Sequence, residues 1–263
     1  MRPVRLGAVG YLNARPLTWA LDRSPERWQI RYDVPSVCSS LLHAGDIDLG
    51  LVPSIDYLFA DDYRFVPGVG IGSRGPVASV ALFSGVPVEE IRTVALDTSS
   101  RTSVTLIRIL CRHRFRIDPE FVSHGPQLEA MTQKYDAGLL IGDPALETDA
   151  AALGLRKIDL GEEWTRMTGL PFVYAAWTGR AGAIDAPGVR ALQEAQTEGE
   201  RATEAIAAEY GQGNAARTAR AAAYLRDNVR YGLGPEEAAG LQMFLDYAAE
   251  LGLAPRKRVL EFF

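Results

Sequence analysis

The sequence predicts a two-lobed α/β protein with two crossover strands and a helical C-terminal segment. Short runs rich in β-branched residues alternate with helical patterns over about the first two thirds of the chain, which is typical of parallel sheets joined by crossover helices. After Trp177 the pattern becomes helical only. No repeat, low-complexity segment or long linker separates these parts, which favours a discontinuous domain.

The composition indicates an ordinary folded protein. Of the 263 residues, 47% are hydrophobic and 23% are charged, which suffices for a substantial core. The net charge of -5, with scattered basic residues, excludes a continuous basic face for nucleic acid. Cys38 and Cys111 stand far apart and are expected to be reduced and buried. No apolar run approaches the roughly 20 residues of a membrane helix, and Asn13 and Arg15 interrupt the first run before a secretory signal could form. We therefore expect a cytoplasmic protein with no membrane partner.

The expected elements follow from local patterns. Strands are predicted at 5–9, 29–34, 49–52, 64–69, 77–84, 93–96, 137–141, 155–159 and 172–177. Helices are predicted at 100–115, 186–210 and 214–231, with a further helix opened by Pro235. In the helix at 100–115, Val104, Ile107, Leu110 and Cys111 recur at helical spacing, so this helix should pack on a sheet.

The chain is expected to cross between the lobes twice. Residues 1–85 and 172–263 would form lobe I, and residues 86–171 would form lobe II. The crossing strands would be 77–84 and 172–177, and nearby glycines and prolines are candidate hinge residues: Gly85, Pro87, Gly169 and Pro171. Two lobes with two crossings place a ligand between them.

Polar residues follow two of the predicted lobe I strands. Tyr11 and Asn13 lie at the carboxyl end of the first strand, where open α/β sheets bind ligands. Asn13 is equally interpretable as a helix cap, and Tyr11 as a packing residue in the cleft wall. Pro53 and Ser54 open a helical turn whose backbone N–H groups would face the cleft and could bind an anion.

The strongest local signal lies at the start of the helix at 100–115. Hydroxyl groups, a guanidinium group and unpaired N–H groups would gather at the positive end of the helix dipole, where they could hold a carboxylate. The residues in question are Ser99, Ser100, Arg101, Thr102 and Ser103. A capping motif alone explains one or two of them.

Other motifs add little chemistry. Asp143 follows another predicted strand, where it would either cap the next helix or face the ligand. The sequence lacks the phosphate-binding, nucleophile-elbow and zinc-protease motifs, and His43, His113 and His124 do not share metal-ligand spacing. We therefore expect no metal site, and no side chain stands out as a general base.

Taken together, several segments resemble a known family. They are GYLNARPL, GDIDLGLVPSIDYL, GPVASVALFS, DTSSRTSVTLIRILC, LIGDPAL and DLGEEWTRMTGLPFVYAAW, which span about residues 5–178 in order. This set resembles the chorismate dehydratases of the futalosine route to menaquinone, which have the type II periplasmic-binding-protein fold. The resemblance implies a lyase that converts chorismate to 3-[(1-carboxyvinyl)oxy]benzoate and water without a metal or organic cofactor.

The resemblance also implies residue roles. Asn13 corresponds to the family's catalytic asparagine, and Ser79 to its cleft serine. Our hypothesis is that Asn13 positions the leaving hydroxyl or stabilises a carbanion, that Ser79 binds one substrate carboxylate, and that residues 100–103 hold the other. A carboxylate of the substrate is a candidate proton acceptor, because no protein base stands out.

Two alternatives remain open from the sequence. The same fold serves non-catalytic binding proteins, so the chain could be a cytosolic receptor for a small carboxylated ligand. It could also be a related enzyme for another small acid, such as a member of a pyrimidine-precursor pathway. The sequence makes no prediction of the oligomeric state.

Overall fold

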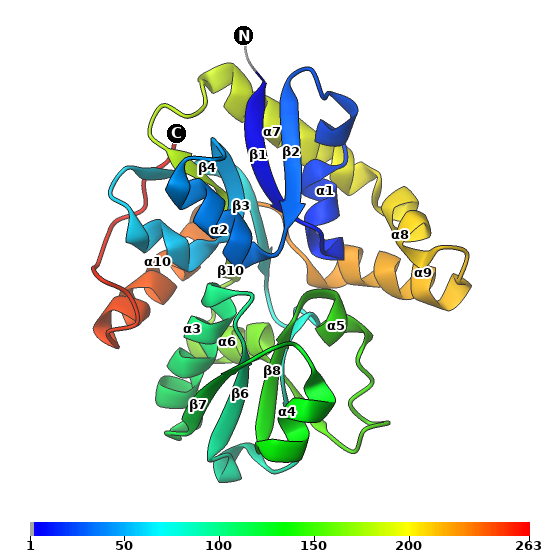
Figure 1. Ribbon diagram of the computed structural model, residues 1–263, viewed down its shortest axis with the longest axis vertical. Coiled ribbons are helices and arrows are strands. Elements are labelled where there is room, and N and C mark those ends of the chain that lie inside the picture. Colours follow the sequence, from blue (N-terminus) through cyan, green and yellow to red (C-terminus); the bar gives the residue numbers. More distant parts are fainter. Residues whose placement is uncertain (1–2) are drawn as a thin grey trace.

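The computed structural model describes residues 3–263 and contains two sheets, one in each of two lobes (Figure 1). The first sheet has the strand order β2-β1-β3-β10-β4 and the second has the order β7-β6-β8-β5-β9. The strands of the first sheet are β1 (Val4–Val9), β2 (Trp28–Asp33), β3 (Leu49–Pro53), β4 (Tyr63–Ser73) and β10 (Phe172–Arg180). Those of the second are β5 (Val80–Ser84), β6 (Thr93–Asp97), β7 (Glu120–His124), β8 (Ala137–Ile141) and β9 (Arg156–Asp159).

Helices connect the strands and form the end of the chain. Before β5 lie η1 (Leu12–Ala14), α1 (Arg15–Thr18), η2 (Leu21–Arg23), α2 (Pro35–Ala44) and η3 (Ser54–Phe59). Between β5 and β10 lie η4 (Val88–Glu90), α3 (Arg101–Leu110), η5 (Cys111–Phe115), α4 (Leu128–Lys134), α5 (Gly142–Glu147) and α6 (Leu160–Thr168). The tail consists of α7 (Ala186–Arg201), α8 (Thr203–Gly211), α9 (Ala215–Ala223), η6 (Tyr224–Asn228) and α10 (Pro235–Glu250).

Both sheets are mixed, so the expectation of parallel sheets was only partly right. β1 is parallel to β2 and β3, and β6 is parallel to β7 and β8. In contrast, β10 is antiparallel to β3 and β4, and β5 is antiparallel to β8 and β9. The reason is geometric: a strand that enters a lobe from the other lobe starts at the edge where the parallel strands end, and it must run away from that edge.

The first crossing consists of residues 74–79, between β4 in the first sheet and β5 in the second. β5 therefore belongs to the second sheet, whereas the predicted boundary at residue 85 had placed it in lobe I. Within the crossing, Gly75 and Ala78 have φ values of 86° and 65°. Gly85 and Pro87 follow the far end of β5 and lie outside the crossing, while Gly169 ends α6 just before β10.

One carboxylate fixes the first crossing in place. Asp159 caps α6 by accepting hydrogen bonds from the backbone N–H groups of Gly161 and Glu162. It also accepts hydrogen bonds from the N–H groups of Val77 and Ala78, at 3.1 and 2.6 Å. The start of the return helix and the outgoing crossing are thus held by the same side chain, which stabilises the left-handed conformation of Ala78.

The predicted strands are confirmed within a few residues, with one omission. β7 was missed because it is an edge strand with largely exposed and half-buried residues, which leaves no continuous apolar run in the sequence. The predicted helix at 186–210 is divided at Ala202, and the helix predicted at 214–231 ends in the π-helical turn η6. Cys38 and Cys111 are free and buried, as predicted.

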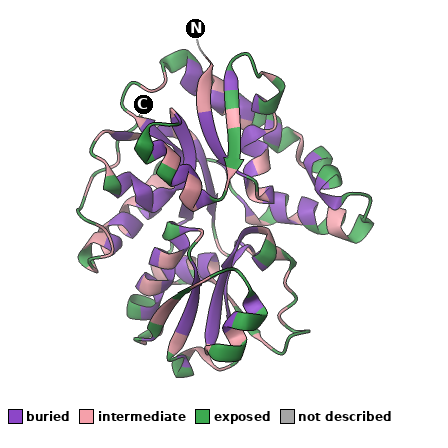
Figure 2. Cartoon of the chain, in the orientation of Figure 1, coloured by how far each residue is buried: buried purple, intermediate pink, exposed green. Residues whose placement is uncertain are grey.

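Buried residues follow the strands in both lobes, and exposed residues gather on the outer faces of the helices (Figure 2). At the rear, the second-lobe helix α6 and the tail helix α10 meet over the start of β10. The ring of Phe172 lies 5.1 Å from that of Trp164 and 4.9 Å from that of Phe244, both edge-on. Within residues 3–263, no helix combines the length and the apolar character required to cross a membrane.

Tail helix α7 packs closely on α1, and we expect this contact to be sensitive to a single methyl group. A Cβ atom at Gly199 would lie 1.8 Å from the carbonyl oxygen of Pro16. Helix propensity favours alanine by about 1 kcal/mol, but the clash requires the backbone to shift. Gly199→Ala should therefore lower the free energy of unfolding by about 1–3 kcal/mol, measured by urea denaturation.

The matched control is Gly85→Ala, because a Cβ atom at Gly85 meets nothing within 4 Å. This variant should be unchanged or more stable by about 0.4–1 kcal/mol. Equal stability of the two variants would contradict the close packing of α7 on α1.

Candidate functional site

A narrow cavity of about 40 Å³ lies between the lobes, where the carboxyl ends of the parallel strands of both sheets meet. Its wall combines first-lobe residues, second-lobe residues and the start of β10. The lining residues are Val9, Tyr11, Asn13, Pro35, Pro53, Ile71, Val80, Ser100, Ser103, Ile141, Gly142, Tyr174 and Ala175. Of the residues predicted to form a site, Tyr11, Asn13, Pro53, Ser100 and Ser103 are therefore brought together at one cavity.

The first-lobe side of the cavity is formed by the segment after β1. Tyr11 precedes η1, and its ring packs against Gly142, where a Cβ atom would approach the ring to 2.9 Å. Gly142 has a φ of 67°, so both its backbone and its neighbour require glycine. Burial raises the pKa of the Tyr11 hydroxyl, which keeps it neutral.

Asn13 has no capping role in the structure. Neither η1 nor α1 is capped by a side-chain hydrogen bond. The Asn13 Oδ1 atom is buried and has no hydrogen-bond partner among the described residues. A buried acceptor without a partner is unusual in a folded protein, and at a cavity wall it can bind a donor from a ligand.

Ser79 lies at the end of the first crossing and is 1% exposed. Its carbonyl oxygen accepts a hydrogen bond of 2.7 Å from the N–H of Gly142. Its hydroxyl lies 2.7 Å from the hydroxyl of Tyr224, a residue of the helical tail. Burial raises the pKa of Tyr224, and Ser79 and Asn13 oppose that shift. Tyr224 was not among the predicted site residues, because only the fold brings the helical tail next to Ser79.

The second-lobe side of the cavity is the N-terminus of α3. Ser100 is the N-cap, and its hydroxyl accepts a hydrogen bond of 3.4 Å from the N–H of Ser103. The two hydroxyl oxygens are 3.1 Å apart, and both side chains are buried. The first N–H groups of α3 have no partner within the helix. Hydroxyl and backbone donors thus converge at the positive end of the helix dipole, as an anion site requires.

Arg101 does not line this cavity. Its guanidinium group lies 3.1 Å from the Asp56 carboxylate, and its side chain is 49% exposed. Asp56 belongs to η3 in the first lobe and also accepts a hydrogen bond from the hydroxyl of Ser39. Burial raises the pKa of Asp56, while the Ser39 and Arg101 contacts counteract that rise. Arg101 therefore joins the two lobes outside the cleft rather than facing a ligand.

Ser54 and Thr102 also make contacts between elements instead of lining the cavity. The Ser54 hydroxyl donates a hydrogen bond of 2.8 Å to the carbonyl oxygen of Val173 in β10. The Thr102 hydroxyl accepts one of 3.2 Å from the N–H of Ile55. Because this N–H group is already paired, the helical turn after Pro53 does not offer it to an anion.

Asp143 and Ser99 connect the lobes beside the cavity. The Asp143 carboxylate accepts a hydrogen bond of 3.0 Å from the N–H of Leu12, and burial raises its pKa. The carbonyl oxygen of Ser99 accepts one of 3.0 Å from the N–H of Ser36 at the start of α2. The Ser99 side chain also counteracts the rise that burial causes in the pKa of Tyr11. These contacts describe a closed arrangement of the lobes.

A further polar contact joins α5 to the helical tail. Glu147 of α5 accepts hydrogen bonds from the hydroxyl of Tyr210, at 2.7 Å, and from the guanidinium group of Arg217, at 2.8 Å. Tyr210 and Arg217 belong to the tail helices α8 and α9, and Figure 1 shows α9 running just above α5 of the second lobe. The tail thus contributes to closure.

The cavity is lined mainly by apolar residues and contains no cationic side chain. Its lining residues include no lysine, arginine or histidine. Among residues 3–263, no group of histidine, cysteine, aspartate and glutamate side chains is arranged to hold a metal ion. An anion in this cavity would be bound by neutral hydroxyl and backbone donors.

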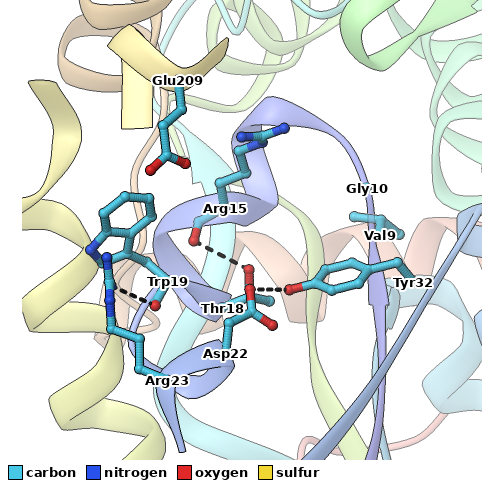
Figure 3. A pocket seen from close by; sticks show the side chains of 9 residues that line it. All are labelled: Val9, Gly10, Arg15, Thr18, Trp19, Asp22, Arg23, Tyr32 and Glu209. Atoms are coloured by element: carbon cyan, nitrogen blue, oxygen red, sulfur yellow. Dashed lines mark hydrogen bonds between the residues drawn. The ribbon is translucent and has the colours of Figure 1, made fainter. Parts of the chain in front are cut away.

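A larger cavity, of about 440 Å³, lies outside the cleft next to β1 (Figure 3). Its lining residues are Val9, Gly10, Arg15, Thr18, Trp19, Asp22, Arg23, Tyr32 and Glu209. The hydroxyl of Tyr32 donates to Asp22 at 2.6 Å, and Arg23 lies over the ring of Trp19 at 4.0 Å. Most of its polar groups are therefore paired with one another, and the cavity brings together none of the predicted site residues.

Known proteins resemble the chain along its whole length. The menaquinone biosynthesis family matches residues 4–250. A chorismate dehydratase of Thermus thermophilus is 31% identical over 274 residues, which cover 97% of this chain and 98% of that protein.

Solved structures share the fold. Protein AF1704 from Archaeoglobus fulgidus superposes with a TM-score of 0.75 at 18% identity, covering 96% of this chain and 98% of that one. The alkanesulfonate-binding protein SsuA from Xanthomonas axonopodis pv. citri, bound to MOPS, gives a TM-score of 0.72 at 18% identity, with coverage of 99% and 96%. The periplasmic aliphatic sulphonate binding protein SsuA from Escherichia coli gives 0.68 at 23%, with coverage of 98% and 90%. These likenesses confirm the periplasmic-binding-protein fold.

The raised pKa of Asp143 predicts a pH-dependent contribution to stability. Between the ordinary aspartate pKa of about 3.9 and the higher folded value, the folded state binds more protons than the unfolded state. Wild-type stability from this group therefore falls as pH rises through that range. An asparagine side chain at this position does not titrate, but its oxygen can still accept the hydrogen bond from the N–H of Leu12. Asp143→Asn should gain stability relative to wild type as pH rises from about 4 to 7, measured by thermal unfolding.

Asp136 supplies a control of opposite sign. Although burial pushes its pKa up, hydrogen bonds from Arg92 and Thr93 hold it below its ordinary value. Asp136→Asn should therefore lose stability relative to wild type as pH rises toward the ordinary aspartate pKa of about 3.9, and the difference should stay constant at higher pH. A pH-independent difference for Asp143→Asn would show that its carboxylate is not destabilised by burial.

Proposed function

The chain belongs to the menaquinone biosynthesis family, and we propose that it is a cytoplasmic chorismate dehydratase, a lyase that converts chorismate to 3-[(1-carboxyvinyl)oxy]benzoate and water. The observation that carries the proposal is the full-length similarity to a chorismate dehydratase. The site supports it, because Asn13 lines the cleft together with the hydroxyls of Ser100 and Ser103 at a helix N-terminus, and Ser79 immediately precedes the lining residue Val80.

Chorismate is a dianion, and the cleft offers neutral donors for its carboxylates. Ser100, Ser103 and the first N–H groups of α3 would bind one carboxylate, and Ser79 the other. Fixed donors in a site that excludes water interact more strongly with charge than donors in solution, because little solvent screens them. The apolar wall of Val9, Ile71 and other aliphatic residues would surround the ring.

The reaction would proceed as a stepwise elimination. The C–H bond of the carbon that bears the enolpyruvyl ether breaks first, and its electron pair spreads through the adjacent double bond to the ring carboxylate. The neighbouring C–O bond then breaks, so that the hydroxyl leaves with its electron pair and takes up a proton to form water. The ring becomes aromatic, which drives the reaction. Donors around the ring carboxylate stabilise the charge that develops on it.

The unpartnered Asn13 Oδ1 atom favours one of the two roles considered for this residue. A carbonyl oxygen accepts a hydrogen bond, so it can hold the leaving hydroxyl by its hydrogen, whereas it cannot stabilise a negative charge. Asn13 would thus orient the C–O bond for elimination. No lysine, histidine or carboxylate lines the cavity, which supports a substrate carboxylate as the proton acceptor.

The direct test incubates purified protein with chorismate and no added nucleotide or metal, and follows product by chromatography and mass spectrometry. We expect accumulation of the aromatic enolpyruvyl ether with loss of one water per molecule. Tight chorismate binding without turnover, measured by calorimetry, would instead support a binding protein, and absence of both would overturn the assignment to chorismate.

Asn13→Ala should lower kcat about 10²- to 10³-fold, the size of effect seen when a fixed hydrogen-bonding group is removed from an active site. The control is Asn214→Ala, which removes an asparagine that caps α9 through the N–H of Arg217 at 3.0 Å. That variant should lose about 1 kcal/mol of stability and retain its kcat. Normal turnover by Asn13→Ala would remove Asn13 from the mechanism.

A further inference from the structure

The helical tail contacts the first crossing at several points. The backbone of Arg230 pairs with that of Gly72 through hydrogen bonds of 2.8 Å in both directions. The Asn228 amide donates a hydrogen bond of 3.0 Å to the carbonyl oxygen of Pro76, and the Tyr224 hydroxyl lies 2.7 Å from the Ser79 hydroxyl. The tail segment 224–230 therefore follows the crossing from the end of β4 to the cleft.

The π-helical turn presents these side chains to the crossing. Tyr224 and Asn228 are the first and last residues of η6, where the N–H of Val229 donates to the carbonyl oxygen of Tyr224 at 3.3 Å. Such π-helical turns are rare interruptions of α-helices and occur frequently at functional sites. Here the turn brings a phenol into contact with the cleft serine.

The burial of the Tyr224 hydroxyl indicates which residue donates in the Ser79–Tyr224 hydrogen bond. Tyr224 is 3% exposed, so its hydroxyl hydrogen needs an acceptor within the protein. The Ser79 Oγ atom lies within hydrogen-bonding distance of it, at 2.7 Å. Tyr224 therefore donates its hydroxyl hydrogen to Ser79 Oγ.

We propose that Tyr224 is a positioning residue for the dehydration: its hydroxyl donates to Ser79 Oγ and so leaves the Ser79 hydrogen to bind a substrate carboxylate. Because a hydroxyl that accepts a hydrogen bond is a stronger donor, Tyr224 would strengthen the bond from Ser79 to the substrate. This inference rests on the proposed function and assigns a role to the tail within it.

The test is a double-mutant cycle on chorismate turnover with Ser79→Ala, Tyr224→Phe and the double variant. Tyr224→Phe removes one oxygen and keeps the ring in the core, so the fold should persist, as checked by its unfolding temperature. We expect Tyr224→Phe to lower kcat about tenfold in the wild-type background and less than about twofold when Ser79 is already alanine, because coupled groups are not additive.

Two matched variants separate this role from a structural one. Tyr231→Phe removes the hydroxyl of another buried tail tyrosine, one with no hydrogen-bond partner in the described part of the chain, and should leave kcat unchanged. Asn228→Ala breaks the neighbouring contact to Pro76 without touching the Ser79–Tyr224 pair, and should change kcat less than about twofold.

The outcomes are distinguishable. An unchanged kcat in Tyr224→Phe, losses that multiply in the double variant, or an equal loss in Asn228→Ala would each overturn the role of Tyr224 while chorismate turnover by the wild type stands. Failure of the wild-type protein to turn over chorismate would overturn the proposed function and this inference together.

Discussion

The structure depends on how the first crossing is fixed between the two lobes. The Asp159 carboxylate holds Val77 and Ala78 on one side, and it caps the helix by which the chain returns. The tail holds the same segment from the other side through Asn228. Ser79 is therefore rigidly placed, although it lies on a connection between lobes and not on a regular strand. A site built on a mobile hinge would lose the orientation that catalysis requires.

A second constraint is the absence of cationic side chains from the residues that line the cavity. A buried arginine would bind a dianion strongly, but in the unliganded cleft it would have to be desolvated without a partner. Neutral hydroxyls and a helix terminus cost less to bury and still present positive potential to an anion. Arg101 is paired with Asp56 outside the cavity, so its charge contributes to closure and not to the wall.

The sequence predicted the position of the site better than the direction of its side chains. Asn13, Ser100 and Ser103 were found because a strand that ends before a helical turn places them at the cleft. Arg101 and Thr102 were included for the same reason, but each residue of a helix is rotated by roughly 100° from the last. Ser100 and Ser103, three apart, share a face, while the two between them point elsewhere. Tyr224 could not be predicted, because only the fold brings the tail to Ser79.

The polar groups between the lobes and those inside the cleft differ in whether they have hydrogen-bond partners. The outer contacts between the lobes are complete, as between Asp143 and Leu12 or Glu147 and Arg217. The inner groups at the cleft include Asn13 Oδ1, which is buried without a partner among residues 3–263. An unsatisfied buried polar group costs about 1–3 kcal/mol. A ligand that donates to this oxygen would remove that cost, and lobes closed over the ligand would exclude the water that competes for the developing charge.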